Sequence, residues 1–286
     1  MMFAFLPTAI MYILNIALML LSFYISFTAE SMKDIGISLC LFLISFISMI
    51  AVVVFSLRLY LTLLPECGTD FEKWYAKQKR ISKRAVGGNK TAVLLNMAYG
   101  CIANERTEEA AECLTRVKKR VERSGKPIYT FIYLSNLLHY KEIQHDLSNS
   151  ATLLAHMQEQ LQRMKFRSDR VRVSYINRFE YICLSVELYK RTPEMLSGAE
   201  RELTQRYNIA ANTNLQNIAG AEKSFGYSEL SLCYGIALSN IILGSESQAQ
   251  PYLEAIAGSG LKYPLVQRVE RYLSKKDISI LMETMP

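Results

Sequence analysis

Two long uncharged runs open the chain, and their length decides the first prediction. No charged side chain occurs in residues 1–29 or 35–57. An apolar helix of about 20 residues is long enough to cross the hydrocarbon core of a bilayer. The pattern therefore predicts two transmembrane helices, about 4–27 and 36–62, which form an N-terminal hairpin within residues 1–64.

Two alternatives to a membrane hairpin fit the sequence less well. A secretory signal peptide begins with basic residues and ends at a small-residue cleavage site, whereas the first basic residue here is Lys33. A helix on the surface of a soluble domain keeps one polar face. Residues 37–55 instead carry Phe and Ile on every face, so we favour the hairpin.

Small and polar residues follow a stripe along each predicted span. The stripes comprise Thr8, Asn15, Ser22 and Ser26 in the first span, and Ser38, Ser45, Ser48, Val52 and Ser56 in the second. Such residues let membrane helices approach closely and bond to each other. The stripes fit packing of the hairpin on itself or on a second copy. They fit equally well serines that bond only within their own helix.

The distribution of Lys and Arg predicts the orientation. The short loop between the spans holds one basic residue, Lys33, whereas the segment 65–90 is strongly basic. Basic residues close to a span stay on the cytoplasmic side. We therefore expect a cell-membrane protein with two spans, both termini in the cytoplasm, and a basic juxtamembrane segment against an anionic inner leaflet. The residues expected to contact the membrane surface are Arg58, Lys73, Trp74, Lys77, Lys79, Arg80, Lys83 and Arg84.

From residue 91 onward the apolar periodicity is helical and no run alternates as a strand would. The glycines at 87 and 88 read as a flexible joint before this all-α domain, 91–286. Residues 209–224, rich in Asn, Ala and Gly, are expected to form mainly a loop. The expected helix pairs are 91–103 with 107–121, 128–143 with 148–164, 170–189 with 195–207, and 227–243 with 247–256, followed by 264–273 and 277–282.

Two segments carry a more specific pattern. The first comprises Leu94, Met97, Ala98, Cys101, Ala110, Leu114 and Val117, and the second comprises Cys233, Ile236, Ala237, Asn240, Ala249, Leu253 and Ile256. Their spacing resembles that of the tetratricopeptide repeat (TPR). The resemblance implies a TPR-like α-solenoid of helix pairs, whose concave groove binds a peptide or a partner domain. Groove residues cannot be assigned without the repeat register; Tyr99, Asn136 and Asn240 are candidates.

The sequence holds no motif for catalysis, a cofactor or a metal. The six cysteines form no CxxC pair, and the three histidines lack the spacing of a helix-borne metal site. Glu180 and Glu187, with Glu200 and Glu202 after them, could provide carboxylate ligands. Exposed pairing with arginine is the preferred explanation of these acids.

Two basic clusters lie further along the chain: Lys118, Lys119, Arg120, Arg123 and Lys126, and Arg163, Lys165, Arg167, Arg170 and Arg172. A nucleic-acid surface is one interpretation. Solvated helix ends, where the macrodipole favours cations, are the preferred one.

These observations together predict a membrane-anchored scaffold or adaptor without cofactor or catalysis. Its expected partners are an anionic bilayer, an unidentified cytoplasmic protein and, through the hairpin, a second copy. The alternatives are a membrane-bound enzyme or sensor with a helix-borne site, or a membrane-tethered regulator that binds nucleic acid.

Overall fold

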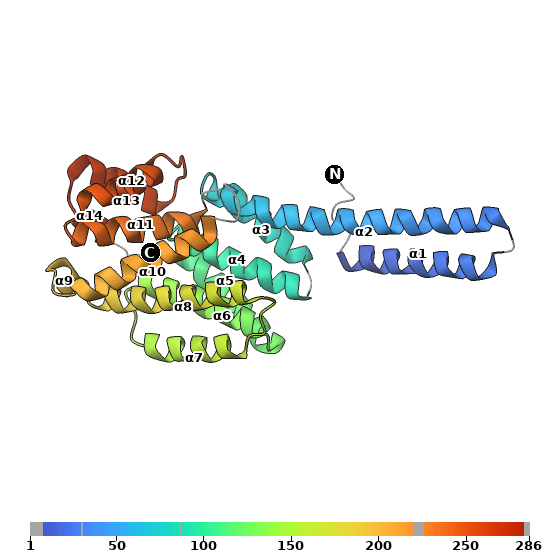
Figure 1. Cartoon of the computed structure of the whole chain (residues 1–286), viewed down its shortest axis with the longest axis horizontal. Coiled ribbons are helices and arrows are strands. Elements are labelled where there is room, and N and C mark those ends of the chain that lie inside the picture. The colour runs from blue at the N-terminus through green and yellow to red at the C-terminus, as the bar shows by residue number, and fades with distance from the viewer. Residues whose placement is uncertain (1–7, 30, 86, 220–225, 283–286) are drawn as a thin grey trace.

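The computed structural model describes residues 8–29, 31–85, 87–219 and 226–282, with backbone alone at 8–13, 51–66, 193, 196 and 219. Within these residues the chain is helical and contains no strand. A long helical hairpin projects from a domain of packed helices (Figure 1). The fold prediction is therefore confirmed as far as its all-α class and its repeated helix pairs.

The hairpin consists of α1 (Thr8–Thr28) and α2 (Met32–Cys67). Its two helices meet along a polar seam. The Ser38 hydroxyl donates to the Ser22 carbonyl over 2.7 Å and lies 2.5 Å from the Ser26 hydroxyl. Further along, the Ser45 hydroxyl donates to the Asn15 carbonyl over 3.0 Å. Ser22, Ser26, Ser38 and Ser45 of the polar stripes thus pack the hairpin on itself. The side chains of Thr8, Val52 and Ser56 lie outside the described residues.

The outer face of the hairpin is apolar and exposed. Phe27 is 89% exposed, Leu20 64% and Ile47 64%. Among the described residues, Met32–Ile50 is long and apolar enough to span a membrane, and only 11% of that window is buried in the protein. Leu14–Thr28 is a shorter apolar helix. One candidate span near the N-terminus is weak evidence taken alone, so the two-span hairpin stays a prediction.

The segment expected to be a juxtamembrane stalk forms a helix of the domain, α3 (Phe71–Arg84). Its N-cap is Asp70, whose carboxylate accepts from the Lys73 amide over 3.0 Å. Trp74 is fully buried, because Gly100 on the neighbouring helix has no side chain and leaves room for the indole. The prediction that Trp74 contacts the membrane surface is therefore wrong.

The helices after α3 form successive pairs in which each helix packs against the next. In the first three pairs the first helices also touch, α4 with α6 and α6 with α8, whereas α8 is linked to α11 through α10. The elements are α4 (Gly87–Ala103) and α5 (Thr107–Ser124), α6 (Pro127–Ile143) and α7 (Ser150–Arg163), α8 (Asp169–Lys190), α9 (Thr192–Leu196) and α10 (Arg201–Ala219), α11 (Tyr227–Ile242) and α12 (Glu246–Ala257), and α13 (Pro264–Lys275) and α14 (Ser279–Met282).

Two local predictions differ from the structure. Residues 209–219, expected as loop, complete α10, because polar side chains bond along the helix: the Asn214 amide donates to the Ala210 carbonyl over 2.9 Å. Residues 220–224 lie outside the described part. The glycines expected as a flexible joint form the first turn of α4, where Gly87 adopts a positive φ of 55°.

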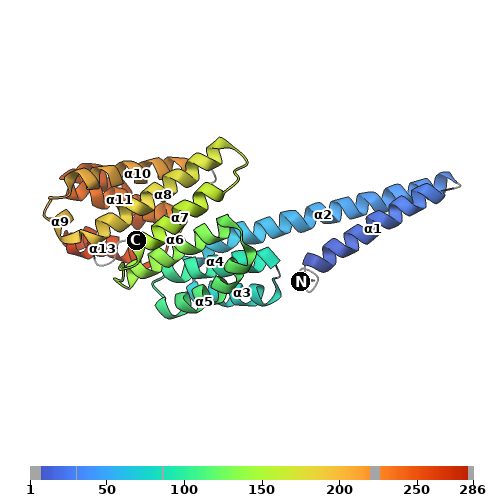
Figure 2. The same cartoon turned by 90° about the horizontal axis from the view of Figure 1, so that it is seen from below.

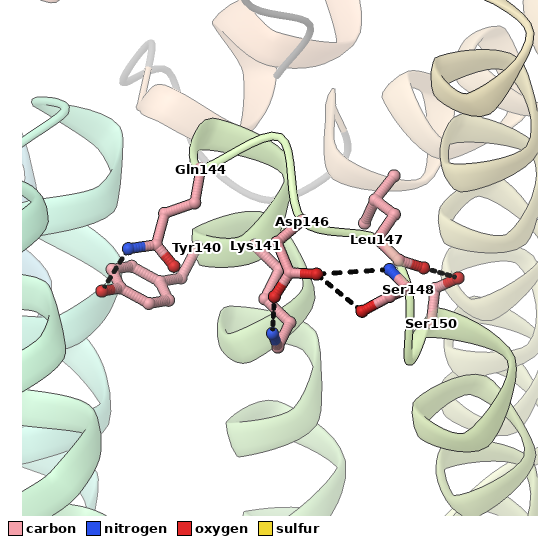
Figure 3. A network of polar contacts seen from close by, with 7 residues as sticks. All are labelled: Tyr140, Lys141, Gln144, Asp146, Leu147, Ser148 and Ser150. Carbon is pink, nitrogen blue, oxygen red and sulfur yellow. Dashed lines mark hydrogen bonds and ion pairs between the residues drawn. The ribbon is translucent and has the colours of Figure 1, made fainter.

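The turn between α6 and α7 illustrates how a pair is closed (Figure 3). The Asp146 carboxylate accepts from Lys141 Nζ over 2.5 Å and from the Ser148 hydroxyl over 2.7 Å. These donors lower the pKa of Asp146 to about 2, with the Lys141 bond as the largest cause. The Ser150 hydroxyl donates to the Leu147 carbonyl over 2.8 Å at the start of α7.

Candidate functional site

The best-defined pocket in the described part of the chain is lined mainly by the first helices of the pairs. Its lining comes from α4, α6, α8, α10, α11 and α13 and from the turn after α4. Helices far apart in the sequence, such as α4 and α11, therefore line the same pocket. Its cavity volume is about 110 Å³, which holds roughly eight water-sized groups at about 10–15 Å³ each. The pocket thus fits a side chain rather than a large cofactor.

One wall of the pocket joins the first helix pair to the last ones. The hydroxyls of Tyr99 on α4 and Ser228 on α11 lie 2.6 Å apart. The Tyr99 ring also meets the Tyr227 ring edge-on at 5.7 Å between centroids, and Tyr227 meets Tyr263 in the same way at 5.1 Å. The helical domain is therefore curled, with its ends in contact.

An ion pair closes the same wall. Arg268 Nη1 on α13 lies 2.5 Å from Glu105 Oε1, and the Arg268 side chain is only 6% exposed. Glu105 follows α4 with a positive φ of 55°, which directs the chain into the turn. Because the guanidinium is buried, removal of either partner leaves an uncompensated charge. The pair therefore holds α13 against the end of α4.

The tyrosines of the pocket are neutral hydrogen-bonding groups. Burial raises the pKa of Tyr181 to about 12, and it raises the pKa of Tyr99 and of Tyr227 as well. The Tyr181 hydroxyl lies 3.1 Å from that of Tyr207. These groups can thus donate or accept without carrying charge at neutral pH.

A histidine and a buried acid stand on the opposite wall. His139 Nδ1 lies 2.7 Å from Glu142 Oε2, and Glu142 is 1% exposed. The contact fixes the imidazole ring, which lines the pocket together with Ile143 and Tyr181. Arg178 from α8 stands at the exposed rim. The pocket thus offers apolar, aromatic and charged surface to a bound group.

Few residues predicted from sequence take part in this pocket. Tyr99 lines it. Asn136 instead donates its amide to the Leu95 carbonyl over 2.9 Å between α6 and α4, and Asn240 is buried in α11. The residues of the TPR-like pattern lie in the core rather than the pocket: Leu94, Met97, Ala98, Cys101, Ala110, Leu114, Val117, Ile236, Ala237, Ala249, Leu253 and Ile256 are all buried.

The basic residues predicted to meet the membrane lie mostly on the surface of α3. Lys73, Lys79, Arg80, Lys83 and Arg84 are exposed, and Lys77 is half-buried. The side chain of Arg58 lies outside the described residues.

Two of the four carboxylates considered as metal ligands, Glu187 and Glu200, are engaged with arginine. Arg191 lies 2.5 Å from Glu187 and 2.9 Å from Glu200, and all three side chains are at least partly exposed. Within the described residues, no three His, Cys, Asp or Glu side chains come close enough to hold a metal ion. The arrangement here is a pair of surface salt bridges.

Sequence reasoning missed most of the pocket. Glu105 and Arg268 are 163 positions apart, and Tyr99 and Ser228 are 129 apart. No periodicity links residues at such separations. These contacts depend on the curl of the helical domain, which the sequence pattern does not predict. No family model matches this chain, and no curated protein or solved structure matches it either.

Proposed function

We propose that this protein is a membrane-anchored adaptor. A two-span hairpin fixes it in the bilayer, and a TPR-like helical solenoid binds part of a cytoplasmic protein in the pocket described above. The observation that carries the proposal is the origin of the pocket lining: α4, α6, α8, α11 and α13, each the first helix of its pair, all contribute, and α10 adds Asn214 and Ile218. First helices that face a common concave side are the arrangement by which solenoids bind partners.

The anchor is supported by the polarity of the hairpin. Its serines bond inward at the seam, while large apolar side chains such as Leu20 and Phe27 point outward and are exposed. Lipid is the solvent in which such an outer face is stable, because water would hydrate this apolar surface at a free-energy cost. Interhelical hydrogen bonds between small residues also suit packing in lipid.

The orientation rests on the basic residues that follow the hairpin. The inner leaflet attracts exposed cations such as those of α3, and basic segments near a span remain in the cytoplasm. A reporter active only in the cytoplasm, fused after Pro286, should therefore be active. A reporter active only outside the cell should be inactive at the same position, and the opposite result would refute the topology.

Partner binding can be tested by site-specific photo-crosslinking in cells that express the full chain. A benzophenone amino acid in place of Ile143 lies in the pocket wall, and one in place of Gln162 on α7 is a control on exposed surface. The proposal predicts one saturable adduct, identified by mass spectrometry, at Ile143 and not at Gln162. Equal labelling at both positions, or none, would count against an adaptor.

A further inference from the structure

We propose that the end of the helical domain nearest the hairpin is a docking face for an anionic lipid surface. This proposal rests on the membrane anchor proposed above and goes beyond it. It gives a role to the two basic clusters at 118–126 and 163–172, which the sequence alone favoured as solvated helix ends.

Chain reversal brings the basic segments to one end of the domain. Each helix turns back on its predecessor, so the α3–α4, α5–α6 and α7–α8 junctions share one end. In Figures 1 and 2 this is the end that looks toward the start of α1. The basic segments 79–90, 118–128 and 163–172 belong to these three junctions.

The charge of this end differs from that of the rest of the chain. The three segments contain 15 Lys and Arg residues against two acids, Glu122 and Asp169. Because the chain has 33 basic and 26 acidic residues in all, the remainder has 18 basic and 24 acidic residues. The positive charge of the protein is therefore concentrated on one face.

The register of the hairpin places this face at the membrane surface. The seam pairs Ser22 with Ser38 and Asn15 with Ser45, so Thr8, where α1 begins, lies level with residue 52 of α2. The proposal takes this level as the inner edge of the bilayer, close to the end of the apolar window Met32–Ile50 and before residue 62, where the sequence placed the end of the second span. From there α2 continues 15 residues to Cys67, or about 22 Å. The 14 residues of α3 then return toward the hairpin, over about 21 Å. The last turn of α3 thus lies nearer the base of the hairpin than the end of α2 does.

Side chains at this face suit a lipid headgroup layer. Lys83, Arg123 and Arg167 are exposed, and each basic residue close to an anionic leaflet strengthens attraction about fivefold. Two apolar side chains stand among them: Ile128 is 40% exposed and Val171 42%. Apolar groups within a basic surface are typical of proteins that lie on a membrane. Nucleic acid is the less favoured occupant, because the bilayer that holds the hairpin already covers this end.

Docking can be measured on the full chain in lipid nanodiscs. A donor dye on Ser124→Cys reports the basic face, and a dye on Asn149→Cys reports the opposite end, which is one helix length away. Energy transfer to a headgroup-labelled lipid is compared in phosphatidylcholine discs with and without phosphatidylserine. The proposal predicts stronger transfer from Ser124→Cys, which rises with phosphatidylserine and falls in 0.5 M salt.

Matched charge variants decide which surface is responsible. Lys119, Arg123 and Lys126 changed to Gln should reduce the ratio of docked to undocked protein on the order of a hundredfold. The same change at Lys190, Lys275 and Lys276, at the opposite end, should leave docking unchanged. All six side chains are exposed, so both variants are expected to fold, and circular dichroism checks this.

Three results would contradict the docking face. They are energy transfer that does not change with phosphatidylserine, equal energy transfer from both dyes, or unchanged docking of the variant with Gln at Lys119, Arg123 and Lys126. Tight, salt-sensitive binding of RNA to this face without any lipid effect would assign it to nucleic acid instead. Resistance of the protein to alkaline extraction separates the two proposals. Protein that resists extraction but does not dock would support the anchor and contradict the docking face. Protein that is extracted would contradict both proposals.

Discussion

The hairpin and the helical domain are built with opposite polarity. Between α1 and α2 the buried side chains are Asn15, Ser22, Ser38 and Ser45, and the exposed ones are large and apolar. In the domain the core is apolar and aromatic, and Lys and Arg cover the surface. The buried side chains are thus polar in the hairpin and mainly apolar in the domain. The difference is the one that the proposed anchor requires, with lipid around the hairpin and water around the domain.

The largest expected effect comes from the core of the domain. Trp74→Ala should lower the free energy of unfolding by about 3–5 kcal/mol, because the indole fills the space over Gly100. Lys73→Ala, on the exposed side of α3, should change it by less than about 0.5 kcal/mol. Denaturant titration in detergent measures both. If Trp74→Ala instead weakened membrane association and left stability unchanged, Trp74 would be a surface anchor.

The outer face of the hairpin should respond to charge as a lipid-facing surface does. Ile44 is 58% exposed, so Ile44→Lys would be nearly neutral in water. In a bilayer the same change costs about 3 kcal/mol at mid-span and should reduce membrane insertion, measured as the fraction resistant to alkaline extraction. Ile44→Leu is the control. Unaltered insertion of Ile44→Lys would remove the contrast between the two regions.

The polar seam should contribute less to the free energy of unfolding than the domain core does. Ser38→Ala removes the bonds that its hydroxyl makes with Ser22 and Ser26. Interhelical hydrogen bonds in membranes average about 0.6 kcal/mol each, so the free energy of unfolding of the hairpin should fall by about 1–2 kcal/mol. Half-buried Ser48→Ala on the same helix is the control. Unfolding by titration with sodium dodecyl sulfate gives the difference, and an equal effect of both changes would contradict a specific seam.

The smallest effect is expected at the exposed α6–α7 turn. The bond from Lys141 holds the pKa of Asp146 at about 2, below its usual 3.8. A lowered pKa stabilises the folded state above pH 4, and this stabilisation is lost as the pH falls toward 2. Asp146→Asn should therefore slightly lower the midpoint temperature of thermal unfolding at pH 6, and should leave it unchanged at pH 2. A difference that persists at pH 2 would assign the effect to packing of the turn.

The sequence predicted what is local and periodic. Uncharged runs indicated α1 and α2, whereas the serine stripes left open whether they pack the two helices together. The predicted helix starts at residues 107 and 264 coincide with those of α5 and α13. Trp74 was misplaced because an aromatic residue among lysines looks like an interfacial anchor, and nothing in α3 reveals the space above Gly100. The Glu105–Arg268 pair could not be predicted, since it depends on the curl of the whole domain.

The contrast in polarity is tested most directly by the reactivity of thiols toward a maleimide in intact membranes. Cys40 is exposed on the outer face of α2, and a maleimide reacts only with a thiol that water can ionise. We expect no labelling of Cys40 until detergent dissolves the bilayer, while Lys190→Cys, exposed at the end of the domain opposite the basic face, reacts at once. Peptide mapping distinguishes the sites. Labelling of Cys40 in intact membranes as fast as Lys190→Cys would show that water, not lipid, surrounds the hairpin.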